Sequence, residues 1–380
     1  MREVNEMAAM RNYELISADS HVVEPPDLWD KWLDAKYRDR APKLVKDEEG
    51  GDAWQYGPDA PPAPLGLVCC VAIPREGMKW TGFRYGENVH PSVHDGKARL
   101  EVLDTDGVDA EFLYPPQRAI TSFALYDDAE LNLAGIEAYN QWLIEGFCAA
   151  DPTRLFPVYQ IPNLGIDVSV AQLRQAHKLG CRAAVISTWP SGNPALGRDD
   201  DPFWQVAEEL KIPISMHFGL ATTTLNHESP PEAAGALGAV NGIIKMGPVL
   251  IDMIFSGVFD RFPGLHMMGI EVGCAWVPHV AEMMDDRYWR NRTHVGLDLK
   301  KLPSQYLRSN WAFSYIVDQI AVQMRHAVGI ESMLWSTDFP HHGNDYPYSR
   351  ETIEAHFVNV PDEERRLILA GNCERLYGLR

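Results

Sequence analysis

The hydrophobic positions of this chain form two alternating patterns: short apolar runs, and longer stretches in which apolar residues recur every three or four positions. Eight short runs predict strands, the first beginning at Leu15 and the others at Val108–Tyr114, Leu155–Ile161, Arg182–Ser187, Pro213–His217, Leu265–Ile270, Asn310–Tyr315 and Met333–Thr337. The helical spacing predicts helices at Asp27–Tyr37, Arg99–Thr105, Asp127–Ala150, Val168–Leu179, Pro202–Leu210, Gly238–Phe262, Ala275–Arg290, Asp318–Val328, Arg350–Phe357 and Asp362–Leu376. This alternation predicts an α/β fold, a (β/α)8 TIM barrel. A doubly wound open sheet is the alternative, but no Gly-x-Gly-x-x-Gly turn follows a strand.

These patterns predict one barrel domain over residues 13–380, preceded by a polar, loosely ordered leader over residues 1–12. One long interruption follows the first strand. Residues 38–96 are rich in Pro and Gly and predict an irregular insertion of the kind that forms lids. Its aromatic side chains either line an apolar pocket or anchor the loop on the barrel: Trp54, Tyr56, Trp80, Phe83 and Tyr85.

The composition narrows the class of partner. Of the 380 residues, 46% are hydrophobic and 23% charged, an ordinary globular balance. The 53 acidic residues outnumber the 34 basic ones and give a net charge of −19, which argues against nucleic-acid and membrane partners. The six cysteines form no Cys-x-x-Cys pair, and we find no signal-peptide core and no apolar run of membrane length. We therefore expect free thiols and a cytoplasmic protein.

Acidic residues and histidines stand where four of the predicted strands end: Asp19, His21 and Glu24 after the first, His217 on the fifth, Glu271 after the sixth, and Asp338, His341 and His342 after the eighth. Each alone has an ordinary explanation, such as a helix cap, a core histidine or a surface acid. The carboxyl ends of barrel strands converge on one face, so we expect these side chains to share a cavity. Carboxylates and imidazoles gathered in this way predict a metal site.

These residues carry a family resemblance. Asp19-Ser20-His21, His217, Glu271, the run Thr337-Asp338-Phe339-Pro340-His341 and the closing Ala370–Gly378 resemble the amidohydrolase superfamily, and within it the aminocarboxymuconate-semialdehyde decarboxylase-like branch, amidohydrolase-2. The resemblance implies a metal-dependent barrel hydrolase or non-oxidative decarboxylase, and, by analogy with dimeric members, a homodimer. Its usual ligands are His-x-His on strand 1, a strand-5 His, a strand-6 His and a strand-8 Asp.

This chain departs from that ligand set. Asp19 replaces the first His, Glu271 stands at the strand-6 position, and strand 4 ends in Ser187-Thr188-Trp189 without a bridging Lys. Together with Glu24 and Asp338, these acids would place four negative charges in one cavity, which two divalent ions would neutralise. Oxygen-rich ligation favours iron, with manganese or zinc as alternatives. The carboxylate-rich set also resembles an offshoot of the superfamily that houses a nonheme di-iron monooxygenase.

The sequence therefore predicts a di-iron monooxygenase that uses O2 to hydroxylate a hydrophobic small molecule. The six predicted metal ligands are Asp19, His21, Glu24, His217, Glu271 and Asp338, and the candidate catalytic residues are Asp338, His341 and His342. The alternative is a zinc- or manganese-dependent hydrolase or non-oxidative decarboxylase, in which Asp338 or a nearby His moves the proton. A non-enzymatic binding scaffold is a third interpretation, but it leaves the buried carboxylates without compensation.

Overall fold

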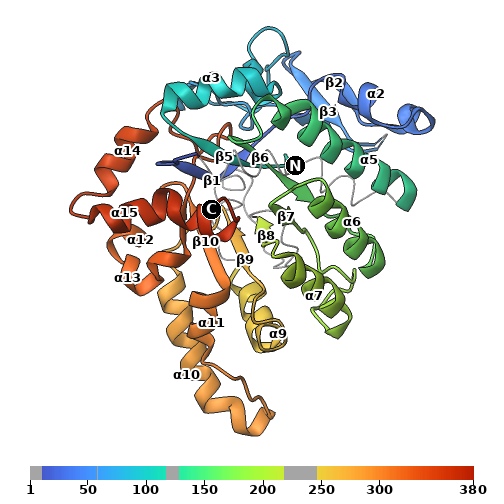
Figure 1. Cartoon of the computed structure of the whole chain (residues 1–380). Coiled ribbons are helices and arrows are strands. Elements are labelled where there is room, and N and C mark those ends of the chain that lie inside the picture. Colours follow the sequence, from blue (N-terminus) through green and yellow to red (C-terminus); the bar gives the residue numbers. More distant parts are fainter. Residues whose placement is uncertain (1–10, 58, 117–127, 218–245) are drawn as a thin grey trace. The chain divides into compact units, whose positions relative to one another are not determined.

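The computed structural model describes residues 11–57, 59–116, 128–217 and 246–380 (Figure 1). The chain divides into two compact units. Unit 1 comprises Met1–Pro162, Ser336–Asn359 and Leu379–Arg380. Unit 2 comprises Asn163–Trp335 and Val360–Gly378. The expected leader lies almost entirely outside the described residues.

Parallel strands form the core of each unit. Unit 1 contributes β1 (Ile16–His21), β5 (Ala110–Tyr114) and β6 (Leu155–Gln160), and unit 2 contributes β7 (Ala183–Val185), β8 (Ile214–His217), β9 (Met267–Ile270), β10 (Trp311–Tyr315) and β11 (Met333–Trp335). Within unit 1, β1 pairs parallel with β5 and β5 with β6; within unit 2, each strand from β7 to β11 pairs parallel with the next. The strands follow sequence order within each unit, β1-β5-β6 in unit 1 and β7-β8-β9-β10-β11 in unit 2, as the strands of a (β/α)8 barrel do. All eight predicted strands are confirmed.

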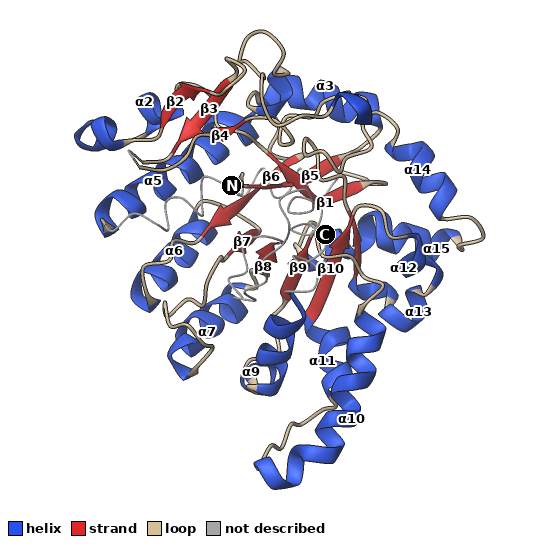
Figure 2. Ribbon diagram, turned by 180° about the vertical axis from the view of Figure 1, so that it is seen from behind, coloured by secondary structure: helices blue, strands red, loops and turns tan. Residues whose placement is uncertain are grey.

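Unit 1 holds the insertion, which is more regular than the sequence predicted. The expectation of an irregular segment over residues 38–96 is wrong in part, because β2 (Lys43–Lys46), β3 (Asp52–Gln55) and β4 (Ala63–Pro64) form a separate antiparallel sheet. Its strands are two to four residues long, too short for a periodic signal in the sequence. Figure 2 shows this small sheet as a distinct group of red arrows.

The helices of unit 1 flank its strands (Figure 2). They are α2 (Leu28–Trp32), α3 (Gly96–Asp106), α5 (Ala129–Gln141) and α14 (Ser349–His356), with 3-10 turns η1 (Ala35–Arg40), η2 (Arg75–Gly77), η3 (Pro91–Val93) and η5 (Cys148–Ala150) and a π-helix η4 (Trp142–Phe147). The helix predicted over 127–150 is thus α5, η4 and η5 in succession, and Asp127 lies outside the described residues. Asp128 begins α5, because its carboxylate accepts the Glu130 and Leu131 amides at 3.0 Å.

Unit 2 carries the remaining helices: α6 (Ile166–Lys178), α7 (Asp201–Leu210), α9 (Val258–Arg261), α10 (Val277–Val295), α11 (Pro303–Asn310), α12 (Gln319–Gln323), α13 (Arg325–Val328), α15 (Asp362–Arg366) and α16 (Asn372–Leu376), with η6 (Arg198–Asp200), η8 (Ile330–Ser332) and the π-helix η9 (Leu367–Gly371). The helix predicted over 238–262 is described from 246; it runs to 255 and stops before Gly257, which has φ +70°. Helix α11 was not predicted.

The core follows the apolar runs, since β1, β5, β8 and β9 are buried at every position. All six cysteines are buried free thiols, as expected. Burial raises the pKa of the Cys181 thiol to about 12, so it stays protonated near neutral pH. Among the described residues, no helix combines the length and apolar composition that a bilayer span requires.

Candidate metal centre

Asp19 and His21 lie at the carboxyl end of β1, and both side chains are completely buried. The register between β1 and β5 shifts between Ser17 and Ser20, so that Ala18 and Asp19 together oppose one residue of β5. Such a bulge re-aims a side chain. Here it leaves Asp19 Oδ1 3.5 Å from His21 Nε2.

The orientation of the His21 ring is fixed by the backbone. Its Nδ1 lies 3.2 Å from the carbonyl oxygen of Pro115, which can only accept, so Nδ1 donates and carries the proton. Nε2 faces Asp19 Oδ1 and also Asp338 Oδ1, which is 3.4 Å away. A histidine that donates one ring nitrogen to a carbonyl and turns the other toward carboxylates has the arrangement of a metal ligand.

Three hydroxyl groups hold the segment that carries Asp338 against β1. Ser17, Ser20 and Thr337 are buried and lie 3.0 to 3.1 Å from one another. The Asp338 amide then donates to the Asp19 carbonyl at 2.9 Å. Two predicted ligands from opposite ends of the chain are thereby joined through the backbone.

Asp338 has a positive φ of 56°, in the left-handed region that side chains other than Gly rarely adopt. Aspartate tolerates this region better than most residues. Strained backbone that is retained in a buried site commonly serves function. At Asp338 it aims a carboxylate at two imidazoles, His21 at 3.4 Å and His341 at 3.1 Å.

His341 lies with Asp338 and His21 in one buried cluster of potential metal ligands, and His342 does not. The His341 ring stacks on that of His21, with 3.9 Å between centroids and 14° between planes, and is only 7% exposed. The side chain of the next residue, His342, is exposed. The structure thus favours His341 over His342 as the histidine that accompanies Asp338.

A buried ion pair supports this end of β1. Arg99 of α3 donates to both oxygens of Glu111 on β5 at 3.0 Å, to the Ser92 carbonyl at 2.8 Å and, through a short bond, to the His21 carbonyl. Burial lowers the pKa of Arg99 although Glu111 raises it, and burial raises the pKa of Glu111 although Arg99 lowers it. The guanidinium also lies 4.5 Å over the Phe339 ring. Arg99 therefore contacts the backbone of one predicted ligand and the neighbour of another.

Unit 2 brings its own two predicted ligands together. His217 ends β8 and is completely buried, and its Nε2 lies 3.6 Å from Glu271 Oε2. Glu271 directly follows β9 and has a positive φ of 58°. The Ser314 hydroxyl on β10 fixes this strained residue by accepting its amide at 2.7 Å. Asp318 caps α12 by accepting the Ala321 amide at 3.0 Å.

Glu24 does not join the cluster. It is 1% exposed, but its carboxylate accepts the Tyr56 hydroxyl at 2.7 Å, and the Tyr85 hydroxyl donates to its carbonyl at 2.6 Å. Among the described residues, the groups of ligand atoms that could hold an ion include Asp19, His21, Asp338 and His341 of unit 1 and omit Glu24. The expectation of Glu24 as a ligand finds no support in this geometry.

The same contacts decide the role of the insertion's aromatic residues. Trp54, Tyr56 and Phe83 are buried, and the Trp54 indole donates to the Tyr85 hydroxyl at 3.3 Å. Trp80 remains 52% exposed. Tyr56 and Tyr85 therefore anchor the insertion on Glu24, after β1, which was one of the two predicted roles.

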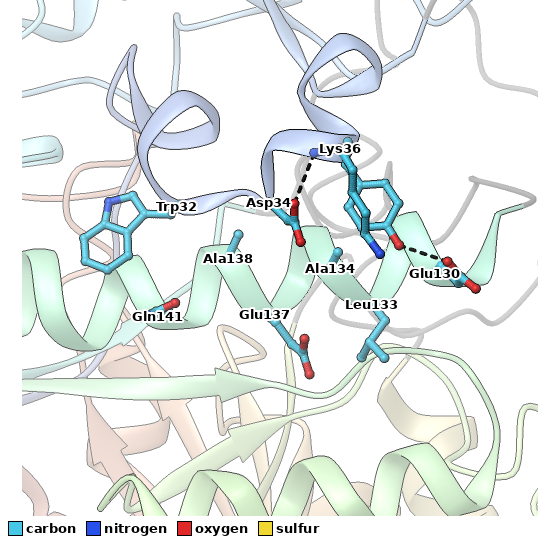
Figure 3. Close-up of a pocket in the computed structure, with 10 residues that line it drawn as sticks. Trp32, Asp34, Lys36, Glu130, Leu133, Ala134, Glu137, Ala138 and Gln141 are labelled. Carbon is cyan, nitrogen blue, oxygen red and sulfur yellow. Dashed lines mark hydrogen bonds between the residues drawn. The ribbon is translucent and has the colours of Figure 1, made fainter.

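A surface cavity of about 500 Å³ in unit 1 lies elsewhere, between the α2–η1 segment and α5 (Figure 3). Its lining mixes aromatic and charged side chains, among them Trp32, Tyr37, Lys36 and Glu130. The Tyr37 hydroxyl donates to Glu130 at 3.0 Å. None of the predicted ligands lines this cavity.

Sequence reasoning missed Arg99 and Glu111. A signal existed, because the buried positions of α3 include Arg99, Val102, Leu103 and Asp106, the spacing of an apolar stripe. A charged residue on such a stripe needs a buried partner. The partner, Glu111, stands inside a predicted strand.

The family of the chain follows from its sequence. A model of the amidohydrolase family, Amidohydro_2, matches residues 73–379. The chain belongs to the amidohydrolase family. None of the curated proteins matches it.

Solved structures share the fold over nearly the whole chain. An amidohydrolase from Mycobacterium avium subsp. paratuberculosis K-10 is 21% identical with a TM-score of 0.73, and the match covers 97% of this chain and 100% of that one. A 5-carboxyvanillate decarboxylase from Sphingomonas paucimobilis is 19% identical with a TM-score of 0.64, at the same coverages. A dihydroxybenzoic acid decarboxylase from Polaromonas sp. JS666, with bound manganese and the inhibitor 2-nitroresorcinol, is 16% identical with a TM-score of 0.62, covering 97% and 98%.

These findings confirm the predicted (β/α)8 barrel and the amidohydrolase resemblance. They favour the alternative function in the sequence analysis, a metal-dependent hydrolase or decarboxylase, over the di-iron monooxygenase that it placed first. The carboxylate and histidine cluster supports metal binding. Neither iron nor use of O2 finds support here.

Proposed function

We propose that this amidohydrolase is a metal-dependent non-oxidative decarboxylase of a hydroxyaryl carboxylic acid. The observation that carries the proposal is the His21 ring, whose Nδ1 is held by a carbonyl and whose Nε2 faces Asp19 and Asp338 in a completely buried position. Family membership supports the enzyme class. The two decarboxylases of similar fold act on hydroxyaryl carboxylic acids, which supports the substrate class.

The proposal includes one divalent ion rather than two. The argument for a second ion rested on four carboxylates, and Glu24 instead accepts the Tyr56 hydroxyl. After β7 the chain continues Ser187-Thr188-Trp189, without the Lys that bridges two ions in some hydrolases. Manganese is favoured, because it suits oxygen-rich ligation and the similar Polaromonas decarboxylase contains it.

The residues have distinct roles under this proposal. Asp19, His21 and Asp338 hold the ion, and His217 and Glu271 stand at strand ends where the family places further ligands. The ion supplies Lewis-acid polarisation of a substrate oxygen. His341, stacked on His21 and 3.1 Å from Asp338, holds the proton that the ring carbon takes up. As that carbon gains the proton, its bond to the carboxylate breaks and the carboxylate leaves as CO2.

The test is anaerobic turnover of manganese-loaded protein with a panel of hydroxybenzoates, measuring CO2 and the decarboxylated arene. We expect turnover without O2, and loss of at least about 100-fold in His21→Ala and Asp338→Asn, since each removes a ligand. His177→Asn, at an exposed position of α6, is the matched control and should retain activity. Turnover that requires O2 and two irons per chain would instead establish the monooxygenase. Ester or lactone cleavage without CO2 release would establish a hydrolase.

A further inference from the structure

The surface cavity between the α2–η1 segment and α5 of unit 1 combines acidic, aromatic and aliphatic side chains. Its volume of about 500 Å³ lies in the range of pockets that take small molecules. Three exposed carboxylates line it, Asp34 from the α2–η1 segment and Glu130 and Glu137 from α5 (Figure 3). Lys36 contributes one positive charge, so three carboxylates against one ammonium group leave two net negative charges. A hollow of this charge favours a cationic ligand.

The cavity already holds an ammonium group against an aromatic ring. Lys36 Nζ lies 4.5 Å from the centroid of the Tyr37 ring, within the range of a cation–π contact. The Tyr37 hydroxyl donates to Glu130 at 3.0 Å, which ties this ring to α5. The contact with Tyr37 foremost, and then the charges of Asp34 and Glu130, raise the pKa of Lys36. These surroundings therefore stabilise an organic ammonium group.

The spacing of the two glutamates on α5 sets the length of a ligand that reaches both. Glu130 and Glu137 are seven residues apart, which is two turns of a helix, so they share a face and are separated by about 10 Å along its axis. Leu133 and Ala134 line the cavity between them and offer apolar surface. On the opposite wall, Asp34 points toward α5 (Figure 3). These features match a linear molecule with a cation at each end and methylene groups between.

We propose that this cavity binds a linear aliphatic polyamine in extended form, with its two terminal ammonium groups on Glu130 and Glu137. The methylene groups lie over Leu133 and Ala134, and Asp34 faces any ammonium group in the middle of the chain. Ammonium groups about 10 Å apart require a chain about as long as that of spermidine or of α,ω-diaminooctane. A single metal ion cannot join the two glutamates, because metal–oxygen bonds are only about 2–2.6 Å long. The inference is independent of the proposed function, since no predicted metal ligand lines the cavity.

Calorimetric titration of the full chain at low ionic strength with amines of different length tests the proposal. The probes are α,ω-diaminooctane, octylamine, which has the same chain and one ammonium group, and putrescine, which has two ammonium groups on a short chain. Diaminooctane should bind once per chain and at least about 5-fold more tightly than either, because it alone reaches both glutamates. Spermidine should bind as tightly as diaminooctane. An affinity for diaminooctane that is no higher than that for octylamine overturns the proposal.

Variants locate the bound amine in the cavity. In Glu137→Gln, diaminooctane should lose its advantage over octylamine, because its second ammonium group has no carboxylate to meet. Lys36→Ala should tighten the binding of diaminooctane at least about 3-fold, since it removes a like charge from the cavity. Glu101→Gln, at an exposed glutamate of α3 in the same unit, makes the same change of charge and should leave binding unchanged. Binding that Glu137→Gln does not weaken, or that Glu101→Gln weakens equally, would be a general attraction to this acidic chain and would overturn the proposal.

Discussion

The imidazole of His341 stacks on the imidazole of His21 with 3.9 Å between their centroids, and the two rings share one carboxylate, that of Asp338. Two stacked rings cannot both be protonated without strong repulsion. Nδ1 of His21 donates to the Pro115 carbonyl, which turns Nε2 toward the carboxylate. The arrangement therefore turns Nε2 of His21 toward the place of a metal ion and puts the ring of His341 within proton-transfer distance of Asp338.

Asp338→Asn tests whether this carboxylate binds the ion. Asparagine tolerates the positive φ of 56°, so the fold should persist. The variant removes one negative charge beside Asp19, so the metal-free protein should be at least as stable as the wild type. Manganese affinity should fall by at least about 100-fold. Calorimetric titration and melting with and without MnCl2 measure both effects, and Asp298→Asn, at an exposed acid, is the control. An unchanged melting shift with manganese would remove Asp338 from the ligand set.

Glu24→Gln separates the two interpretations of Glu24. If this residue only accepts the Tyr56 hydroxyl, the amide oxygen can replace the carboxylate, and manganese should bind with unchanged stoichiometry and affinity. Tyr56→Phe should destabilise the protein by about 1–3 kcal/mol, because it leaves a buried carboxylate without this donor. A loss of metal in Glu24→Gln would return Glu24 to the ligands and revive the argument for a second ion.

The strands were predictable from the sequence because each is a continuous apolar run, buried at nearly every position. The strand-end ligands were predictable for the same reason, since a barrel places such ends on one face. Glu24 was misplaced because its partner Tyr56 comes from a segment with no periodic signal. Arg99 was missed because its role depends on Glu111 and on the His21 backbone. Local pattern therefore located strand-end residues, but not the partners that long-range contacts supply.

Arg99→Met tests the support of the metal centre. Removing the guanidinium leaves Glu111 buried and unpaired, which should cost about 3–5 kcal/mol of stability. The double variant R99M/E111L should recover much of this loss, because it removes the unpaired charge as well. Manganese affinity should stay reduced in both variants, about 10- to 100-fold, since the His21 carbonyl has lost its donor. Chemical denaturation and metal titration separate the two effects. Wild-type affinity in the double variant would show that the pair contributes stability only.

Stability should fall on acidification below neutral pH. Burial lowers the pKa of His94 and of His266 below 6.5, so the folded protein favours their neutral forms. The unfolded chain then binds more protons just below pH 6.5. Stability from these residues is therefore present above 6.5 and lost as the pH falls through their folded pKa values. His94→Gln should flatten the dependence of unfolding free energy on pH between 7 and 5, by at most about 1.4 kcal/mol per pH unit. His177→Gln, exposed on α6, should leave it unchanged.

Glu271→Gly should weaken manganese binding while it stabilises the metal-free fold. Glu271 has φ 58°, where a side chain strains the backbone by about 1 kcal/mol or more, and glycine removes that strain. We therefore expect the metal-free variant to melt at or above the wild-type temperature while manganese affinity falls, because His217 loses the carboxylate 3.6 Å away. Lys211→Gly is the matched control, since Lys211 has φ 55° at the exposed end of α7. It should gain stability and bind manganese normally. If Glu271→Gly also binds manganese normally, Glu271 is not a ligand, and its strained backbone needs another explanation.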